Sequence, residues 1–228
     1  MKKFAIIVAG GSGSRFGSTL PKQFVPLCGM PVLMRTIKAF ADYDAGIDII
    51  VALPTEHLTL WGDLCSSRGF AVKHRVVEGG ASRYESVRNA LFSIPESEGL
   101  VAVHDGARPL VSRQVIATSF DTAERCGTAI PSVPITDSIR QLDRNGSHNV
   151  SRDSLVAVQT PQTFRLNILK DAYSGGFSPL FTDDASVVEF RGTPVTLFPG
   201  DVNNIKITHP VDIKTAEWII AAEGNEQA

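Results

Sequence analysis

Short apolar runs alternate with amphipathic segments along most of the chain. Five runs are nearly continuous in apolar residues, which is typical of strands buried on both faces. They cover residues 4–9, 47–54, 71–77, 100–105 and 128–133. Apolar positions at helical spacing lie between them, at 32–41, 58–68, 83–92 and 113–126. This alternation predicts an α/β fold with a mainly parallel central sheet.

Two local signals support the predicted helix starts. Residues 82–85 read Ser-Arg-Tyr-Glu, which is the pattern of a capping box before the helix at 83–92. Pro210 follows Thr208-His209, at a place where the first turn of a helix tolerates proline. We therefore expect a last helix to begin at Pro210.

The alternation ends after Pro134. Residues 135–142 and 149–160 have an extended pattern, and a polar turn at 143–147 with Asn-Gly at its centre joins them. This pattern predicts a long hairpin that protrudes as an arm. Because such an arm is too thin to bury its own face, we expect 135–160 to mediate dimerisation of a chain that is otherwise one domain, 1–228.

Composition excludes several classes of protein. The net charge is −2 and the pI is about 6.2, so we expect no nucleic-acid or membrane-surface partner. The first apolar run is interrupted by glycines and Arg15 before a signal peptide is complete, and no apolar stretch approaches about 20 residues. These features predict a soluble, cytoplasmic protein. The three cysteines, Cys28, Cys65 and Cys126, lack metal-ligand spacing, and we expect them to be buried thiols.

A glycine-rich segment follows the first predicted strand. It reads Ala9-Gly10-Gly11-Ser12-Gly13-Ser14-Arg15, and Lys22 comes soon after it. Glycines allow backbone N–H groups to approach an anion, and the two cations can neutralise phosphate oxygens. The segment matches neither the GxxxxGK[ST] loop nor the dinucleotide fingerprint. It predicts a phosphate-binding loop, and a glycine turn with solvated cations is the alternative.

A second polar segment ends the buried run at 100–105. His104 and Asp105 stand at its end and Arg108 follows, where an α/β sheet usually binds ligands. Asp105 could help to hold a magnesium ion on a triphosphate. Alternatively, Asp105 caps the following loop. For His104 we favour a buried, hydrogen-bonded histidine without a catalytic role.

Seven motifs in order resemble those of the 2-C-methyl-D-erythritol 4-phosphate cytidylyltransferases of the non-mevalonate isoprenoid pathway. The likeness spans nearly the whole chain and includes the loop through Arg15, Pro21-Lys22-Gln23, residues 79–87, residues 104–109, Thr160-Pro161-Gln162, residues 182–186 and residues 204–208. It implies a Rossmann-like nucleotidyltransferase fold, a homodimer joined through the arm, and a Mg²⁺-dependent reaction of CTP with a polyol phosphate.

The resemblance also implies roles for individual residues. Those expected around the cytidine are Ala9, Gly10, Gly11, Ser12, Gly80, Ala81, Arg83 and Ser86. The expected catalytic cations on the phosphates are Arg15, Lys22 and Lys206. Asp105, Arg108, Thr182 and Lys206 are expected to contact the methylerythritol phosphate, and Asp105 is the candidate metal ligand. Ser138 and Arg152 match positions that the family supplies from the neighbouring subunit.

Milder structural alternatives exist for the remaining motif residues. Thr182 could only cap a helix that begins near Asp183, and Arg152 could only pair with a surface acid such as Asp153. Thr160 and Gln162 could shape the turn at Pro161 without touching a ligand. Gly10, Gly106, Ser138 and Asn203 depart from the family pattern, but none of these changes removes a charged group.

Three functions remain to be weighed. The motifs favour an in-line attack of a substrate phosphate oxygen on the α-phosphorus of CTP, with pyrophosphate leaving and no covalent enzyme intermediate. A ribitol 5-phosphate cytidylyltransferase is the alternative enzyme, because it shares the loop, the lysine and the Asn-Ile-Lys segment. A non-catalytic nucleotide-sensing module is less consistent with so many cations.

Overall fold

The centre of the protein is a mixed β-sheet. The computed structural model describes residues 1–11, 16, 20–144 and 146–226, with the backbone alone for 224–226. Within these ranges, eight strands join in the order β10-β7-β11-β6-β1-β4-β5, with β12 paired to β7. The strands are β1 (Lys3–Val8), β4 (Asp48–Leu53), β5 (Arg75–Glu78), β6 (Leu100–Asp105), β7 (Thr128–Pro134), β10 (Val156–Val158), β11 (Gln162–Arg165) and β12 (Leu197–Pro199).

Four neighbouring strands are parallel, and β11 reverses the direction next to them. β6, β1, β4 and β5 pair in parallel, whereas β11 lies antiparallel between β6 and β7. The predicted mainly parallel sheet is therefore confirmed for this half. The carboxyl ends of β1 and β6 meet at one edge, where Val8 pairs with Asp105.

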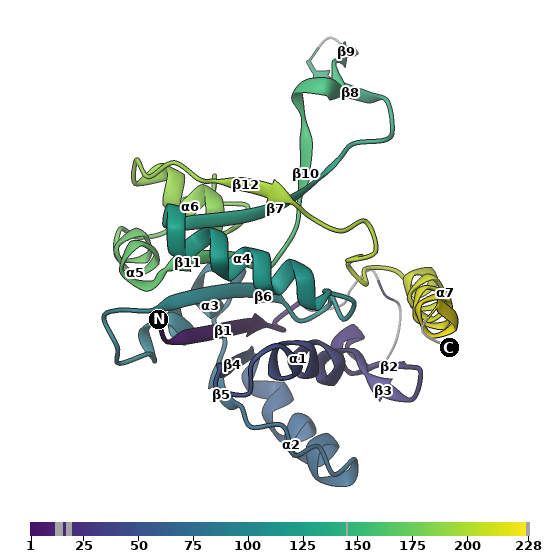
Figure 1. The fold of residues 1–228 in the computed structure, drawn as a ribbon. Coiled ribbons are helices and arrows are strands. Elements are labelled where there is room, and N and C mark those ends of the chain that lie inside the picture. The colour runs from purple at the N-terminus through teal and green to yellow at the C-terminus, as the bar shows by residue number, and fades with distance from the viewer. Residues whose placement is uncertain (12–15, 17–19, 145, 227–228) are drawn as a thin grey trace.

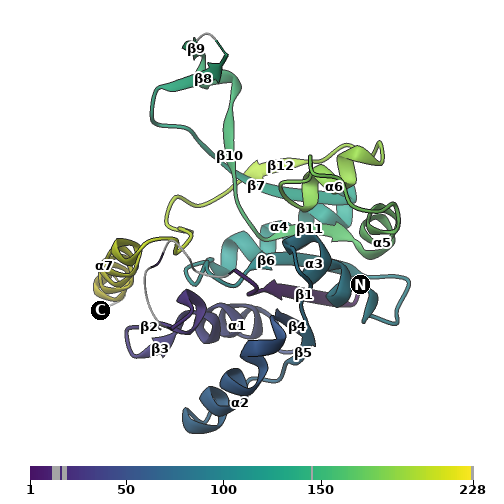
Figure 2. The same ribbon diagram turned by 180° about the vertical axis from the view of Figure 1, so that it is seen from behind.

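Helices cover both faces of the sheet (Figures 1 and 2). α1 (Val32–Tyr43) and α4 (Arg113–Cys126) pack on one face, and α3 (Arg83–Phe92), α5 (Leu166–Ser174) and α6 (Asp184–Phe190) on the other. Along β1, Ala5 and Ile7 enter the first core while Phe4 and Ile6 enter the second. Burial on both faces explains why this strand is apolar at successive positions.

Outside the arm, the remaining elements lie around this layered centre. They are η1 (Lys22–Phe24), β2 (Pro26–Leu27), β3 (Met30–Pro31), η2 (Thr55–His57), α2 (Leu58–Ser67) and α7 (Pro210–Glu226). The predicted start of the last helix at Pro210 is confirmed. Among the described helices, none combines the length and the apolar character that a membrane crossing requires.

Capping interactions fix the start of α3 and both ends of α4. The Ser82 hydroxyl accepts a hydrogen bond from the Glu85 N–H, and the Ser112 hydroxyl accepts one from the Val115 N–H. Gly127 ends α4 in the left-handed conformation with φ of 89°, which glycine adopts without a Cβ clash. Both helices have the predicted bounds.

Two sequence-based expectations about burial are wrong. The run at 71–77 is not a strand buried on both faces, because β5 begins only at Arg75 and forms the largely exposed edge of the sheet. The cysteines are not buried thiols: Cys28 and Cys126 are exposed and Cys65 is half-buried. Cys28 lies in the turn between β2 and β3, and Cys126 ends an amphipathic helix on its outer side.

The arm leaves the sheet at the end of β7 and projects away from the layered centre (Figure 1). At its tip β8 (Ile139–Asp143) pairs antiparallel with β9 (Gly146–Val150), as the predicted turn requires. The returning limb is not one strand, because η3 (Arg152–Ser154) interrupts it before β10 pairs with β7. Because β10 pairs with β7, the end of the arm rejoins the central sheet next to the strand from which the arm leaves.

Candidate active site

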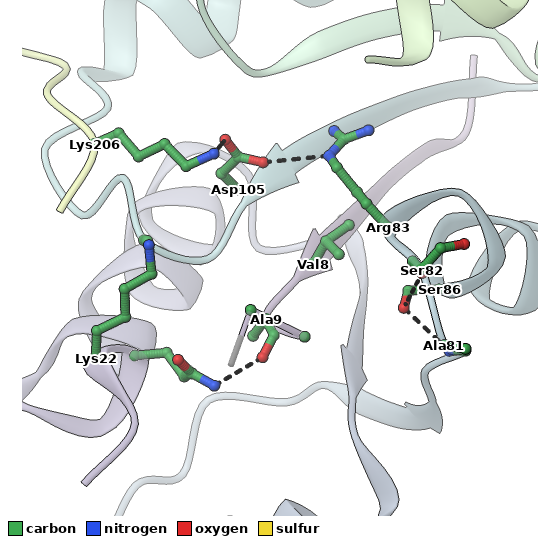
Figure 3. Close-up of a pocket in the computed structure, with 14 residues that line it drawn as sticks. Val8, Ala9, Lys22, Ala81, Ser82, Arg83, Ser86, Asp105 and Lys206 are labelled. Carbon is green, nitrogen blue, oxygen red and sulfur yellow. Dashed lines mark hydrogen bonds and ion pairs between the residues drawn. The ribbon is translucent and has the colours of Figure 1, made fainter. Parts of the chain in front are cut away.

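A pocket opens at the carboxyl ends of β1 and β6 (Figure 3). It is lined by Val8, Ala9, Gly10, Gly11, Lys22, Gln23, Gly80, Ala81, Ser82, Arg83, Ser86, Asp105, Ala107 and Lys206. Val8 ends β1 and residues 9–11 follow it, Lys22 lies on η1, residues 80–86 span the start of α3, and Asp105 ends β6. Lys206 adds a fifth segment, so the fold brings five separate segments into one concave surface.

Most of the expected site residues are in this lining. Of the expected nucleotide-binding set, Ala9, Gly10, Gly11, Gly80, Ala81, Arg83 and Ser86 line the pocket, together with Lys22, Asp105 and Lys206 from the other sets. Ser12 and Arg15 lie outside the residues that the structure describes. Gln23 and Ser82 line the pocket as well, although neither was among the expected binding residues.

Four expected substrate-binding positions are not among the lining residues. Arg108 lies directly beside the pocket, against Asp105. Ser138 and Arg152 belong to the arm, where Arg152 donates a hydrogen bond to the Thr136 carbonyl. Thr182 is exposed just before α6, and Asp183 rather than Thr182 caps that helix. The capping role considered for Thr182 is therefore wrong.

Three cations surround the carboxylate of Asp105. Lys206 Nζ is 2.8 Å from Asp105 Oδ2, Arg83 Nε is 3.6 Å from Oδ1, and Arg108 Nε is 3.7 Å from Oδ2. The Asp105 side chain is only 12% exposed, whereas that of Lys206 is 45% exposed. Lys206 can therefore leave this pair for an anion in the pocket at a smaller desolvation cost than a buried lysine.

These charges determine the ionisation of Asp105. Burial alone would raise the pKa of its carboxyl, but Arg83, Lys206 and Arg108 together hold that pKa well below the ordinary value. Burial likewise opposes the charge on Arg83, and Asp184 and Asp105 outweigh it, so the pKa of Arg83 is raised. Asp105 is consequently an anion and Arg83 a cation at neutral pH.

A buried polar network lies behind Asp105. The Thr160 hydroxyl accepts the Asp105 N–H at 3.1 Å and lies 3.1 Å from His104 Nδ1. His104 Nε2 is 3.1 Å from the Arg108 carbonyl, which can only accept, so Nε2 carries the proton and Nδ1 accepts from Thr160. Asn204 donates to the Thr160 carbonyl and accepts Arg108 Nη1 at its own carbonyl.

This network confirms the expected role of His104 as a buried, hydrogen-bonded histidine. The ring is fully buried, and burial lowers the pKa of His104 to about 4. Thr160 shapes the wall of the site through Asp105 and His104, which agrees with the structural alternative considered for it. Asn204 was not expected to take part, because its partners are remote in sequence.

The loop before α3 presents its backbone to the pocket. Gly80 N–H donates to the Ser86 hydroxyl at 3.1 Å, and this hydroxyl donates to the Ser82 carbonyl at 2.9 Å. A Cβ at Gly80 would lie 2.2 Å from the Glu85 Cβ, a contact that no side chain can tolerate. Glycine is therefore required at 80 so that the loop can fold back over the start of the helix.

Sequence reasoning missed the residues that hold Arg83 from behind. Arg83 Nη2 lies 2.6 Å from Asp184 Oδ2, and the Tyr173 hydroxyl donates to Asp184 Oδ1 at 2.6 Å. Gln162 Oε1 accepts the Asp184 and Ala185 N–H groups. Gln162 was expected only within a motif at the Pro161 turn, and this capping of α6 agrees with a structural role.

The fit of a magnesium ion depends on Asp105. Within the described lining, Asp105 is the one carboxylate, and cations face both of its oxygens. The described residues contain no cluster of three or more histidine, cysteine or acidic side chains that could hold a metal ion by themselves. A magnesium ion fits here only when phosphate oxygens supply most of its ligands, as is usual for this ion.

The pocket is built to receive a polyanion. Its described lining carries Lys22, Arg83 and Lys206 as cations against Asp105 as the one anion. Backbone groups of the glycine segment lie beside them, at the sheet edge where α/β proteins bind ligands. Such an arrangement stabilises negative charge on phosphates and needs no nucleophile from the protein.

Comparison with known proteins identifies relatives along nearly the whole chain. The family model of the 2-C-methyl-D-erythritol 4-phosphate cytidylyltransferases matches residues 4–222. A protein of that name from Bacteroides thetaiotaomicron is 50% identical over 220 residues, which are 96% of this chain and 100% of the relative. The one from Phocaeicola vulgatus is 46% identical with the same coverage.

Solved structures agree in fold. The crystal structure of 2-C-methyl-D-erythritol 4-phosphate cytidylyltransferase from Thermus thermophilus has a TM-score of 0.77 and 32% identity, covering 96% of this chain and 98% of that one. The 4-diphosphocytidyl-2C-methyl-D-erythritol synthase of Anaerococcus prevotii has a TM-score of 0.81 and 26% identity, covering 96% of each chain. With its motifs gathered in one cationic pocket and these relatives spanning its length, the chain belongs to the 2-C-methyl-D-erythritol 4-phosphate cytidylyltransferase family.

Proposed function

We propose that this enzyme transfers the cytidylyl group of CTP to 2-C-methyl-D-erythritol 4-phosphate, in the synthesis of isoprenoid precursors. A phosphate oxygen of the acceptor forms a bond to the α-phosphorus, and the bond from that phosphorus to the β-phosphate oxygen breaks. The products are 4-diphosphocytidyl-2-C-methyl-D-erythritol and pyrophosphate. The acceptor phosphate is already ionised at neutral pH, so no general base is required.

The observation that carries this proposal is the charge arrangement at the end of β6. Asp105 is held between Arg83, Arg108 and Lys206, and Lys22 lines the same pocket. The reaction brings two anions together, and its main obstacle is their repulsion. Cations fixed around the reacting phosphates reduce this repulsion and stabilise the charge that develops at the α-phosphate.

The residues divide by the part of the substrates that they face. Lys22, Lys206 and Arg15 bind the phosphates, although Arg15 lies outside the described structure. The cytidine lies against Ala9, Gly10, Gly11, Ser12, Gly80, Ala81, Arg83 and Ser86, with Ser12 outside the described residues. Asp105, Arg108, Thr182 and Lys206 face the polyol phosphate. Fixed backbone donors and acceptors select cytosine, because another base would leave them unpaired.

Magnesium accompanies the triphosphate as the cofactor in this proposal. The ion would be held by phosphate oxygens and water, with Asp105 as the candidate protein ligand, and it would neutralise phosphate charge. A contact of the ion with Asp105 would compete with Lys206, which lies 2.8 Å from the same carboxylate.

The active unit in this proposal is a homodimer joined through the arm at 135–160. Arg152 and Ser138 are exposed on that arm and are absent from the lining of their own chain's pocket. They would reach the polyol phosphate in the partner's pocket. We place the enzyme in the cytoplasm, where CTP is available.

Pyrophosphate release tests the function directly. The enzyme is incubated with Mg²⁺ and CTP, and with 2-C-methyl-D-erythritol 4-phosphate, ribitol 5-phosphate or no acceptor. We expect rapid pyrophosphate release only in the mixture that contains 2-C-methyl-D-erythritol 4-phosphate as acceptor. This release should be lost when EDTA removes the metal. Faster release with ribitol 5-phosphate would assign the alternative acceptor, and CTP binding without release in any mixture would make the protein a nucleotide-sensing module. UTP and ATP in place of CTP test the base selectivity.

A further inference from the structure

A buried acidic residue behind the pocket holds one of its cations. Asp184 is the first residue of α6, its side chain is 0% exposed, and its Oδ2 lies 2.6 Å from Arg83 Nη2. The Arg83 side chain is 30% exposed and lines the pocket from the start of α3. Its guanidinium therefore bridges two carboxylates, Asp184 behind the pocket and Asp105 at 3.6 Å within it.

Asp184 is itself fixed on every described side. The Tyr173 hydroxyl donates to Asp184 Oδ1, and Tyr173 in turn stacks on Tyr84, the neighbour of Arg83, at 4.7 Å between ring centroids. Gln162 from β11 accepts the Asp184 N–H at 3.0 Å. Burial raises the pKa of Tyr173 well above its ordinary value, and Asp184 adds to the shift, so this hydroxyl stays a donor.

Asp105 has other cationic partners besides Arg83, so a shift of Arg83 toward Asp105 would disturb them. Lys206 and Arg108 already face Asp105 Oδ2. Without the charge of Asp184, the attraction of Arg83 would be directed at Asp105 alone, in a poorly solvated place where such attraction is strong. Arg83 would then turn toward Asp105, compete with Lys206 for it, and leave its place on the pocket wall.

We infer that Asp184, supported by Tyr173 and Gln162, is a positioning residue that fixes the Arg83 guanidinium on the nucleotide side of the pocket. It acts only through Arg83, since no described contact joins its side chain to the pocket itself. We call the Asp184–Arg83 pair, with Tyr173 and Gln162 behind it, the clamp. The inference rests on the proposed function for the identity of the substrates, but the clamp itself is a property of the binding site for the triphosphate.

A double-mutant cycle tests the clamp. The four proteins are the wild type, Asp184→Asn, Arg83→Gln and the double variant, and the quantities measured are kcat/KM for CTP and the Kd of CTP with Mg²⁺. We expect Asp184→Asn to lower kcat/KM roughly 10- to 100-fold, the range associated with a small misplacement of a site residue. The same substitution in the Arg83→Gln background should change it by less than about threefold, since it has no cation left to position.

Matched variants separate positioning from folding. Asp121→Asn makes the same chemical change at an exposed position of α4 that is not in the pocket lining, so kcat/KM should stay within about twofold. Tyr173→Phe removes one donor to Asp184 and keeps the charge, so it should give a smaller loss that also disappears in the Arg83→Gln background. Circular dichroism and Tm identify any variant that fails to fold.

The possible outcomes distinguish a failure of the positioning role of Asp184 from a failure of the proposed function. Equal losses from Asp184→Asn with and without Arg83, or wild-type kcat/KM in folded Asp184→Asn, would overturn the clamp. Wild-type protein that binds CTP but releases no pyrophosphate would overturn the proposed function instead, and the cycle in Kd would still decide the clamp. If Asp184→Asn does not fold, the Tyr173→Phe cycle decides: equal losses in both Arg83 backgrounds, or no loss, overturn the clamp.

Discussion

Lys206 differs from the other cations around Asp105 in its freedom to move. Arg83 is tied to buried Asp184, and Arg108 donates to the Asn204 carbonyl, whereas the Lys206 side chain is 45% exposed. Among the three it is therefore the cation best able to follow a phosphate as charge moves during the reaction. Asp105 would serve as its resting partner in the empty pocket.

Replacing Lys206 tests this role. We expect Lys206→Met to lower kcat about 10²- to 10³-fold, the usual effect of losing one fixed donor to a transition-state oxyanion. Stability should change little, because Asp105 keeps Arg83 and Arg108 as partners. Lys214→Met, on an exposed position of α7, is the control and should turn over as the wild type does. A kcat within about threefold of wild type for Lys206→Met would remove this lysine from the chemistry.

His104 makes the stability of the protein depend on pH. Burial lowers its pKa to about 4 in the folded protein, against about 6.5 in an unfolded chain. Between these values the unfolded chain binds more protons, so the free energy of unfolding falls as the pH is lowered from 6.5 to 4 and the full contribution is present above 6.5. The slope is at most about 1.4 kcal/mol per pH unit.

Urea unfolding at pH 7, 6 and 5 measures this slope. His104→Gln should be less stable than the wild type at pH 7, because it disturbs the bonds to Thr160 and to the Arg108 carbonyl. Its free energy of unfolding should nevertheless fall less steeply with acid than that of the wild type. Parallel slopes for the two proteins would mean that His104 does not carry the dependence.

At the scale of elements, the start of α3 joins packing and recognition. The Ser82 hydroxyl caps the helix, and Ser86 on its first turn holds the Gly80 N–H. The loop thus turns its backbone toward the pocket while its side-chain space is filled by Glu85. A Cβ added at Gly10, by contrast, would meet only the Ser86 hydroxyl, at an ordinary contact distance of 3.5 Å.

This contrast predicts different results for two alanine substitutions. Gly80→Ala places a Cβ 2.2 Å from that of Glu85, so the loop must shift, at a cost of about 1 to 3 kcal/mol and with weaker CTP binding. Gly10→Ala should leave the free energy of unfolding within about 0.5 kcal/mol of wild type. Chemical denaturation of both variants, with calorimetric titration of CTP, compares them. An unchanged Gly80→Ala protein would contradict the steric argument.

The sequence predicts elements where local signals suffice. β6, α3 and α4 have the expected bounds, because a continuous apolar run marks the strand and serines or a left-handed glycine mark the helix ends. β11 was missed, because Gln162 and Thr163 are polar and are satisfied only by remote partners such as Asp183 and Ser119. No local pattern of apolar residues predicts a strand of this kind.

The candidate site divides in the same way. Glycines, Lys22 and Asp105 were found from motifs and family resemblance, since they stand next to predicted strands. Tyr173, Asp184 and Asn204 were not assigned to the site, because their role depends on contacts that only the closed sheet creates. The sequence signal that could have identified these three residues is a polar side chain within a segment whose other side chains are buried and apolar.

At the scale of the whole molecule, the arm determines whether each pocket is complete within one chain. Arg152 lies with the apolar residues Leu155 and Val156 along a groove at the arm's root, apart from the pocket lining. If it serves the partner's site, as we propose, each site contains residues of two chains. A two-fold dimer then has two such composite sites.

Mixed dimers test this arrangement. Lys206→Met and Arg152→Ala homodimers should each be nearly inactive. In a mixed dimer one site carries both changes and the other carries neither, so random exchange should restore about a quarter of wild-type activity. Mass spectrometry confirms that the subunits have exchanged. Exchange without any recovery would show that Arg152 acts in its own chain or not at all, and active Arg152→Ala homodimers would show that it is dispensable.

The wide separation of the clamp residues also has a consequence for biosynthesis. Asp184 follows Arg83 by 101 residues, so it leaves the ribosome roughly 5 to 20 s later at ordinary rates of translation. Until then the nascent chain holds Arg83 and Asp105 without the counter-charges that Asp184 and Lys206 later provide. CTP can therefore stabilise the released protein by binding, but it has no finished site on the growing chain through which to guide folding.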